Sequence, residues 1–153
     1  KSGIGFECVS IGELKHVWTL MPELDPSRIL FTPNFAPRAE YEFALSKGVH
    51  VTVDSIYPLE NWSEIFANRK IFLRLDPGRG RGHHAYVRTA GPQSKFGIAP
   101  DDLARAAEVV DASGARVVGL HAHAGSGIRT SDAWTQTQQG EDTALMRRTS
   151  TGG

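Results

Sequence analysis

The feature that most constrains this chain is a regular alternation of short apolar segments with segments of helical periodicity. The apolar segments predict strands at residues 5–10, 28–32, 49–54, 71–76 and 117–124. Strands that alternate with helices over short links run parallel, because each helix returns the chain to the same end of the sheet. The pattern therefore predicts an α/β fold with five strand–helix units. It fits either an open doubly wound sheet or part of a closed barrel, since an eight-unit barrel needs about 250 residues.

The intervening segments carry the signals of amphipathic helices. Ser10 and Glu13 have the spacing of a capping box and open the first helix,. Further helices are expected from Pro37, over 58–68 and over 101–113, each with apolar residues on one face,. The stretch between the fourth strand and the last helix is rich in glycine and predicts a long loop,.

Composition narrows the possible functions. The chain has 153 residues, with 17 lysines and arginines against 17 aspartates and glutamates, so no basic excess favours nucleic acid,. The single cysteine, Cys8, excludes an internal disulfide and fits a reducing cytoplasm,. No apolar run is long enough to cross a membrane. Since the sequence lacks an initiator methionine, we expect a piece of a longer cytoplasmic protein. Its folded domain is expected over 1–134, with a disordered or non-native tail over 135–153,.

The richest stretch for chemistry covers residues 117–128. Its apolar start leads to His121 and His123, which project to the same side of a strand because side chains alternate,. A turn of small residues follows: Gly125, Ser126 and Gly127. Backbone N–H groups and a serine hydroxyl in such a turn can hold an anion. Imidazole and an anion site at the carboxyl end of a strand are typical of catalytic sites in α/β folds.

Five motifs, taken in order, carry a family resemblance. They are Gly-Phe-Glu-Cys-Val-Ser-Ile-Gly-Glu-Leu at 5–14, Val-Asp-Ser at 53–55, Leu-Arg-Leu-Asp-Pro-Gly at 73–78, Ser-Lys-Phe-Gly-Ile at 94–98 and Gly-Leu-His-Ala-His-Ala-Gly-Ser-Gly at 119–127. Over roughly residues 3–134 the chain resembles the barrel domain of the fold-type III pyridoxal-phosphate decarboxylases. The most similar members are the diaminopimelate decarboxylases, including the form fused to an aspartate kinase. The resemblance implies about five units of an alanine-racemase-like (β/α)8 TIM barrel.

The resemblance assigns cofactor-binding and catalytic roles to individual residues. His123 matches the histidine that stacks on the pyridine ring, and Ser126 matches the phosphate-binding serine, with Gly125 and Gly127 beside it. Without the resemblance, His123 would be read as a hydrogen-bonded core histidine and Ser126 as an ordinary turn serine.

Three further matches complete the implied site. Arg74 matches an arginine on the side of the cofactor's phenolic oxygen, and Asp54 matches an acidic residue close to the cofactor. A structural ion pair is the alternative for Arg74, and a helix N-cap is the alternative for Asp54. Lys95 matches a lysine that pairs across the family's dimer interface and is not the cofactor lysine.

The implied activity is the pyridoxal-phosphate-dependent decarboxylation of meso-diaminopimelate to L-lysine by a homodimer. In the family the Schiff-base lysine precedes the position of Gly5 and other cofactor contacts follow residue 134, so we expect this piece alone to be inactive. Arginine, ornithine and carboxynorspermidine decarboxylases share the scaffold and remain alternatives.

A metal-dependent hydrolase of the amidohydrolase type is an alternative from another class, because His-x-His on a barrel strand can bind a divalent metal. Those sites need further ligands on later strands, and after His123 the only acids are Asp132, Glu141 and Asp142. We therefore expect no metal.

Overall fold

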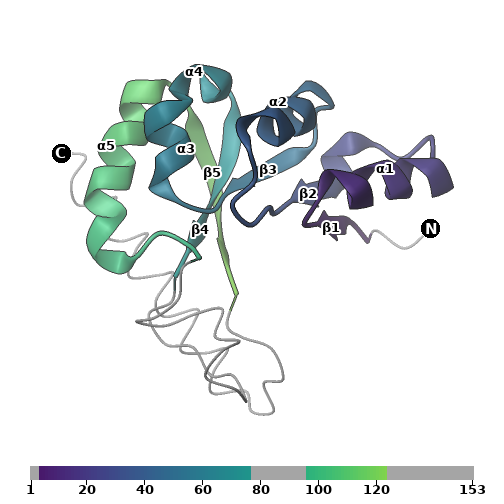
Figure 1. Cartoon of the computed structure of the whole chain (residues 1–153), viewed down its shortest axis with the longest axis horizontal. Helices are drawn as coiled ribbons and strands as arrows, with labels where there is room; N and C mark the ends of the chain where they lie inside the picture. The colour runs from purple at the N-terminus through teal and green to yellow at the C-terminus, as the bar shows by residue number, and fades with distance from the viewer. Residues whose placement is uncertain (1–3, 77–95, 124–153) are drawn as a thin grey trace, which may run out of the picture.

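The computed structural model describes residues 4–76 and 96–123. Within them, five parallel strands form one sheet in sequential order, β1-β2-β3-β4-β5 (Figure 1). The strands are β1 (Phe6–Cys8), β2 (Ile29–Phe31), β3 (His50–Val53), β4 (Lys70–Leu75) and β5 (Arg116–Ala122). Sequential parallel order with helical crossovers is the topology of a barrel and not of a doubly wound sheet. The predicted partial (β/α)8 barrel is confirmed.

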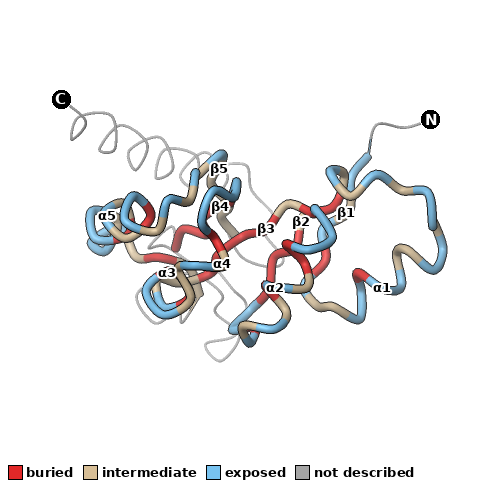
Figure 2. Tube along the Cα trace, turned by 90° about the horizontal axis from the view of Figure 1, so that it is seen from above, coloured by how far each residue is buried: buried red, intermediate tan, exposed pale blue. Residues whose placement is uncertain are grey.

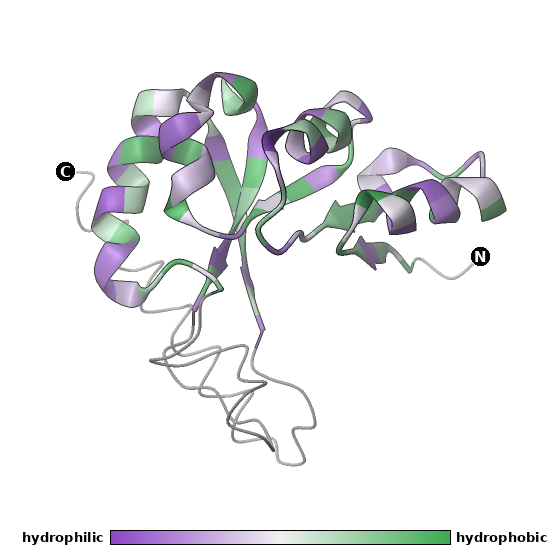
Figure 3. Cartoon of the chain, in the orientation of Figure 1, coloured by the Kyte–Doolittle hydropathy of each residue, from purple (hydrophilic) through white to green (hydrophobic). Residues whose placement is uncertain are grey.

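The five helices of the described residues lie along one flank of the row of strands, as the view from above shows (Figure 2). They are α1 (Ile11–Leu20), α2 (Arg38–Ser46), α3 (Ile56–Asn61), α4 (Ser63–Phe66) and α5 (Leu103–Ser113). Short 3₁₀ turns at Pro26–Arg28 and Pro100–Asp102 precede β2 and α5. Each helix carries hydrophobic and hydrophilic residues, and the alternating colours along α5 make this visible (Figure 3).

The first strand and helix meet where the sequence predicted a capping box. The Glu13 backbone N–H donates to Ser10 Oγ at 3.2 Å, while Glu13 Oε2 accepts the Val9 N–H at 2.7 Å. The capping box is confirmed, with the glutamate reaching one residue further back than usual. Because the Val9 amide is used by the helix, β1 ends at Cys8 and is shorter than the predicted 5–10.

The helix predicted over 58–68 is wrong in its bounds and its continuity. It starts two residues earlier, at Ile56, because Pro58 fits the first turn, where its missing N–H is not needed,. It breaks at Trp62, whose backbone leaves helical geometry at φ −134° and ψ 33°. The Trp62 ring packs against Tyr41 and Tyr57, with centroids 6.1 and 5.5 Å apart.

The hydrophobic core lies between the sheet and the helices. Phe31, Val51 and Ile71 from the strands are fully buried, and so are Tyr41 and Phe66 from the helices. The Tyr41 ring meets Phe31 and Phe66 edge to face, at 6.3 and 5.7 Å. Each large apolar side chain buried in this way stabilises the fold by about 1.5–3 kcal/mol. Tyr41 thus anchors α2 at the centre of the core.

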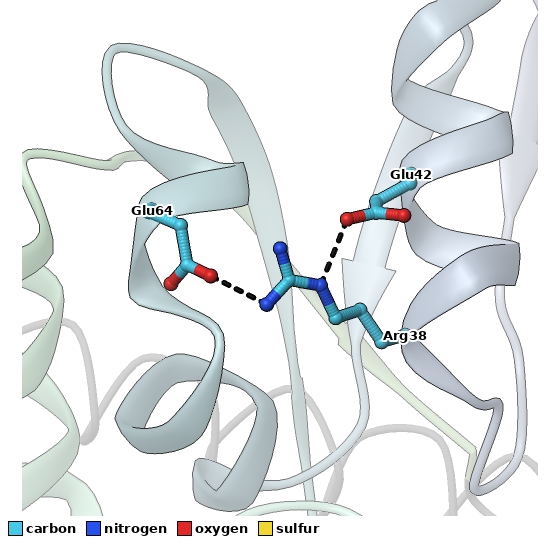
Figure 4. A network of polar contacts seen from close by, with 3 residues as sticks. All are labelled: Arg38, Glu42 and Glu64. Atoms are coloured by element: carbon cyan, nitrogen blue, oxygen red, sulfur yellow. Dashed lines mark hydrogen bonds and ion pairs between the residues drawn. The ribbon is translucent and has the colours of Figure 1, made fainter.

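The surface between α2 and α4 carries an ion-pair network around Arg38 (Figure 4). Arg38 Nε lies 2.8 Å from Glu42 Oε1 on its own helix, and Nη1 lies 2.5 Å from Glu64 Oε1 on α4. These carboxylates raise the pKa of the Arg38 guanidinium. The side chains are exposed, so the network contributes little to stability,.

The register of the strands defines an inner face, opposite the helices. Phe31 pairs with Val51 on the helix side, so the alternate residues Leu30 and His50 share the other side,. On the same grounds the inner face includes Glu7, Thr32, Thr52, Phe72, Arg74, Gly119 and His121. A shallow cavity of about 500 Å³ opens on this face towards the amino ends of the strands, lined partly by Phe6, Leu30 and Phe72.

The sheet is strongly curved around this inner face. Strands lie about 4.8 Å apart, so a flat sheet would separate β1 from β5 by about 19 Å. Yet Glu7 Oε1 on β1 lies 3.4 Å from His121 Nε2 on β5. Two side chains that bridge the first and last strand require the curvature of a barrel wall.

Candidate functional site

Asp54 directly follows β3 and is 1% exposed. Its Oδ2 accepts the Phe35 N–H at 2.8 Å, and its Oδ1 accepts the Tyr41 hydroxyl at 3.0 Å. Its backbone carbonyl accepts the Gly97 N–H at 2.9 Å. Burial and the nearby carboxylate raise the pKa of Tyr41 far above its usual value, so the hydroxyl stays a donor. The alternative role of helix cap is not observed, because Ser55 occupies the N-cap of α3.

The loop after β2 is held in place by Asp54. Phe35 has a left-handed backbone, with φ 51°, which is unfavourable for a bulky residue,. Its N–H bond to Asp54 offsets this strain, while its ring is 56% exposed and lies 5.3 Å from the Phe96 ring. Asn34, one residue earlier, is thereby fixed beside the carboxyl ends of the strands.

Arg74 lies in β4 and is 7% exposed. Its Nη1 donates to Asn34 Oδ1, and its Cζ lies 5.1 Å from the centre of the Phe96 ring. Burial lowers the pKa of the guanidinium, and the negative charge of Asp54 partly opposes this lowering. An arginine nevertheless stays protonated at neutral pH. Arg74 makes no salt bridge with a carboxylate of the described residues, so the structural ion pair is not observed there.

The two histidines occupy the carboxyl end of β5. His121 has its side chain 19% exposed and contacts Glu7, while His123, directly after the strand, is half-buried. Burial lowers the pKa of His121, and the positive charge of Arg74 lowers it further, against the opposing effect of Glu7. His121 is therefore neutral at pH 7.

Two buried polar atoms on the inner face have no hydrogen-bond partner among the described residues. They are Thr52 Oγ1 on β3 and His121 Nδ1 on β5, the strands on either side of Arg74. Buried polar atoms are rarely left unpaired, so each of these atoms needs an explanation such as a bound group or a water. The inner face therefore has unmet hydrogen-bonding capacity on both sides of Arg74.

The structure brings together the predicted residues that it describes. Asp54, Arg74 and His123 all lie at or next to the carboxyl ends of adjacent strands, the end where barrels carry their catalytic sites,. Arg74 is within electrostatic range of Asp54, and His121 is within range of both Arg74 and His123. The predicted Gly125, Ser126, Gly127 and Lys95 lie outside the described residues and stay predictions.

Sequence reasoning missed four members of this cluster: Glu7, Asn34, Tyr41 and Phe96. A charged residue inside an apolar strand was the available signal for Glu7,. Tyr41 was identified as a core residue of α2, but no pattern could reveal that its hydroxyl reaches Asp54. Asn34 and Phe96 lie in loops whose paths depend on the tertiary fold.

Residues 4–76 and 96–123 contain no group of three or more potential metal ligands, and no helix within them is both long and apolar enough to span a bilayer.

Comparison with known proteins gives consistent results. The chain is 40% identical to the diaminopimelate decarboxylase of Methanothermobacter thermautotrophicus over 84% of its length, and 30% identical to that of Escherichia coli over the same share. It covers about 30% of the length of each of these relatives.

Solved structures show the same fold. A crystal structure of a diaminopimelate decarboxylase matches 90% of the chain with a TM-score of 0.74 and 28% identity, and 35% of that protein is covered. The arginine decarboxylase of Paramecium bursaria Chlorella virus, bound to agmatine, matches 97% of the chain with a TM-score of 0.79 and 29% identity, with 38% of it covered.

The family comparison spans nearly the whole sequence. Residues 1–152 match the family described as "Pyridoxal-dependent decarboxylase, pyridoxal binding domain". This match decides against the amidohydrolase alternative. With its parallel barrel strands and its polar cluster at their carboxyl ends, the chain belongs to the pyridoxal-dependent decarboxylases and forms part of their pyridoxal-binding domain.

Proposed function

We propose that this chain forms part of the cofactor-binding barrel of an enzyme that decarboxylates meso-diaminopimelate to L-lysine. The observation that carries the proposal is the convergence of Asp54, Arg74 and His123 at one end of a barrel wall that resembles diaminopimelate decarboxylases in sequence. The substrate is an amino acid, in keeping with the family. We further propose that the enzyme is a cytoplasmic homodimer, which the motif around Lys95 supports by resemblance.

The described residues fit pyridoxal phosphate as the bound group. The ligand is a flat ring with a phenolic oxygen and an anionic phosphate. On this side of the sheet lie a cationic guanidinium at Arg74, an imidazole at His123 and the unpaired Thr52 hydroxyl. Gly125, Ser126 and Gly127 are our candidates for the phosphate,.

The residues of this chain divide the work of binding and orientation. When bound, pyridoxal phosphate supplies an electron sink for the electron pair that stays on the substrate when carbon dioxide leaves. His123 offers a flat ring face that confines a planar ligand. Arg74 stays charged and holds an anionic oxygen, while Asp54 fixes the loop that presents Asn34 to Arg74. The Phe96 ring, which packs against Phe35, covers the guanidinium on one side.

The test uses the complete reading frame that contains this sequence. We expect it to restore growth without lysine in a bacterial strain that lacks diaminopimelate decarboxylase, and to release carbon dioxide from meso-diaminopimelate. Arg74→Gln should lower kcat/KM by roughly a hundredfold, because a preorganised charge is lost. Arg38→Gln, an exposed arginine in the α2–α4 network, is the matched control and should retain activity.

Release of carbon dioxide from arginine or ornithine, with none from diaminopimelate, would overturn the proposed substrate. Equal activities of the Arg74→Gln and Arg38→Gln proteins would overturn the role of Arg74.

A further inference from the structure

A contact between Glu7 and His121 crosses the inside of the curved sheet. Glu7 Oε1 lies 3.4 Å from His121 Nε2 and also accepts the Thr32 hydroxyl at 2.8 Å. Glu7 comes from β1, Thr32 follows β2 and His121 lies on β5, so three elements meet at one carboxylate oxygen. The hydroxyl of Thr32 fixes the carboxylate, and the carboxylate in turn faces the imidazole.

The charges around His121 favour its neutral form. Arg74 is its direct register partner on β4, and His123 follows two residues later, directly after β5. Burial lowers the pKa of His121, and both of these groups lower it too, whereas Glu7 on β1 raises it. The net direction is downward, so at neutral pH the ring carries a single N–H.

The position of that N–H follows from the carboxylate. If Nε2 were unprotonated, its lone pair would face the negative Glu7 oxygen at 3.4 Å, which is repulsive,. The hydrogen therefore belongs on Nε2. Nδ1 is then an acceptor, and it is buried with no partner among the residues described.

The contacts of Arg74 decide how firmly its guanidinium is oriented at the site. Among the residues of the described ranges its guanidinium bonds to one acceptor, Asn34, and packs over one ring, Phe96. Asn34 itself is exposed. A long arginine side chain carries about 2 kcal/mol of rotamer entropy, and besides its burial this one hydrogen bond is the directional contact that orients the guanidinium,. His121 pairs with Arg74 in the register of the sheet and lies on the same face, and the negative charge of Glu7 attracts the guanidinium of Arg74.

We propose that Glu7 and His121 act as positioning residues for Arg74: a neutral His121, hydrogen-bonded through Nε2–H to Glu7, holds the guanidinium in its orientation at the site. A protonated His121 would repel the guanidinium and neutralise Glu7, so the neutral state is part of the role. The benefit to catalysis rests on the proposed function, whereas the pairing and its effect on Arg74 do not.

The first experiment measures the protonation state of His121 by NMR of ¹⁵N-labelled protein. We expect a neutral ring with hydrogen on Nε2 at pH 7.5. Glu7→Gln should lower the pKa of His121, because it removes the one charge that raises it. His50→Gln, on the same face but against Phe72, is the control and should leave the His121 tautomer unchanged. A neutral ring with hydrogen on Nδ1, or an unchanged pKa in Glu7→Gln, would overturn the pairing.

The second experiment follows the Arg74 Nε–H signal in two variants of His121. Glutamine keeps an N–H donor near the Nε2 position, whereas phenylalanine keeps the size and removes the donor. We expect the signal to stay in place in His121→Gln and to move towards that of an exposed arginine in His121→Phe. The same signal in both variants would overturn the positioning role.

The same two variants, made in the complete reading frame, connect the pairing to the reaction. We expect kcat/KM for meso-diaminopimelate to fall at least about tenfold in His121→Phe and to recover to within about threefold in His121→Gln. Equal losses in the two variants would overturn the link to catalysis. An unmutated enzyme without activity on diaminopimelate would refute the proposed function instead, while the NMR results would still decide the pairing.

Discussion

Asp54 shows how a residue identified from a motif can serve the fold and the site together. Both carboxylate oxygens are engaged by the protein itself, through Tyr41 and Phe35. Asp54 therefore acts on the site through the loop that carries Asn34. Its location beside the cofactor was predicted from resemblance, but these partners were not, because they come from a helix and a loop that meet it only in the folded chain.

Substitutions in the Asp54–Tyr41 pair should be costly and non-additive. Asp54→Asn places an amide N–H₂ group against one of two donors, and Tyr41→Phe leaves a buried carboxylate oxygen without its partner. Each should lower the free energy of unfolding by about 1–3 kcal/mol. In urea denaturation the double variant should lose less than the sum of the single losses. Strict additivity would show that the two groups do not interact.

The two threonines of the inner face should respond in opposite directions to replacement by valine. Thr52 is buried and its hydroxyl is unpaired among the described residues, whereas the Thr32 hydroxyl donates to Glu7. Thr52→Val should be neutral or should stabilise the protein by about 1 kcal/mol, and Thr32→Val should destabilise it by a similar amount. Urea midpoints measured without cofactor check this. A destabilised Thr52→Val protein would indicate a partner for that hydroxyl within the chain.

Among the elements, the turn at Gly97 ties the segment that leads into α5 to the sheet. The Gly97 N–H donates to the Asp54 carbonyl, and the next residue, Ile98, exchanges backbone hydrogen bonds with Arg74 and Asp76 at the end of β4. Gly97 has φ +86°, and an added Cβ would lie 2.6 Å from the Asp76 nitrogen. This position therefore requires glycine both for its conformation and for the close approach of the backbone.

Alanine substitutions separate these two requirements. Gly114, at the end of α5, also has a positive φ, of +70°, but an added Cβ would meet nothing within 4 Å. Gly114→Ala should cost about 1 kcal/mol from backbone conformation alone. Gly97→Ala should cost clearly more, because the backbone of β4 must also move. Thermal unfolding of both variants tests the comparison, and equal losses would contradict the close contact at Gly97.

For the molecule as a whole, the strand and helix pattern was readable because most links between strands and helices are short and the helices carry apolar residues on one face. The motifs then decided between the two α/β topologies. The sequence could not reveal the break at Trp62, which depends on ring packing against Tyr41 and Tyr57. Nor could it reveal the partners of Arg74, because Asn34 and Phe96 approach it from distant loops.

Acid should weaken the folded state through His121. Its pKa in the folded protein is lowered from the usual 6.5. The unfolded chain therefore binds more protons as the pH falls, and stability declines below about pH 6.5 and through the lower folded pKa. The urea midpoint should fall less between pH 7.5 and 5.5 in His121→Gln than in the unmodified protein. His16→Gln, on the exposed face of α1, should behave like the unmodified protein.

The sequential strand order also has a consequence for the way the chain acquires its structure. Each strand pairs only with the strand before or after it in the chain, so the sheet can grow by adding one strand–helix unit to the next. Every addition must still close a loop, because parallel partners are joined through a crossover, and such pairing is slow compared with local contacts. The contact between Glu7 and His121 is the exception, since it joins the first strand to the fifth. It can form only after the intervening units have assembled, so it marks the completion of this section of the barrel and not its nucleation.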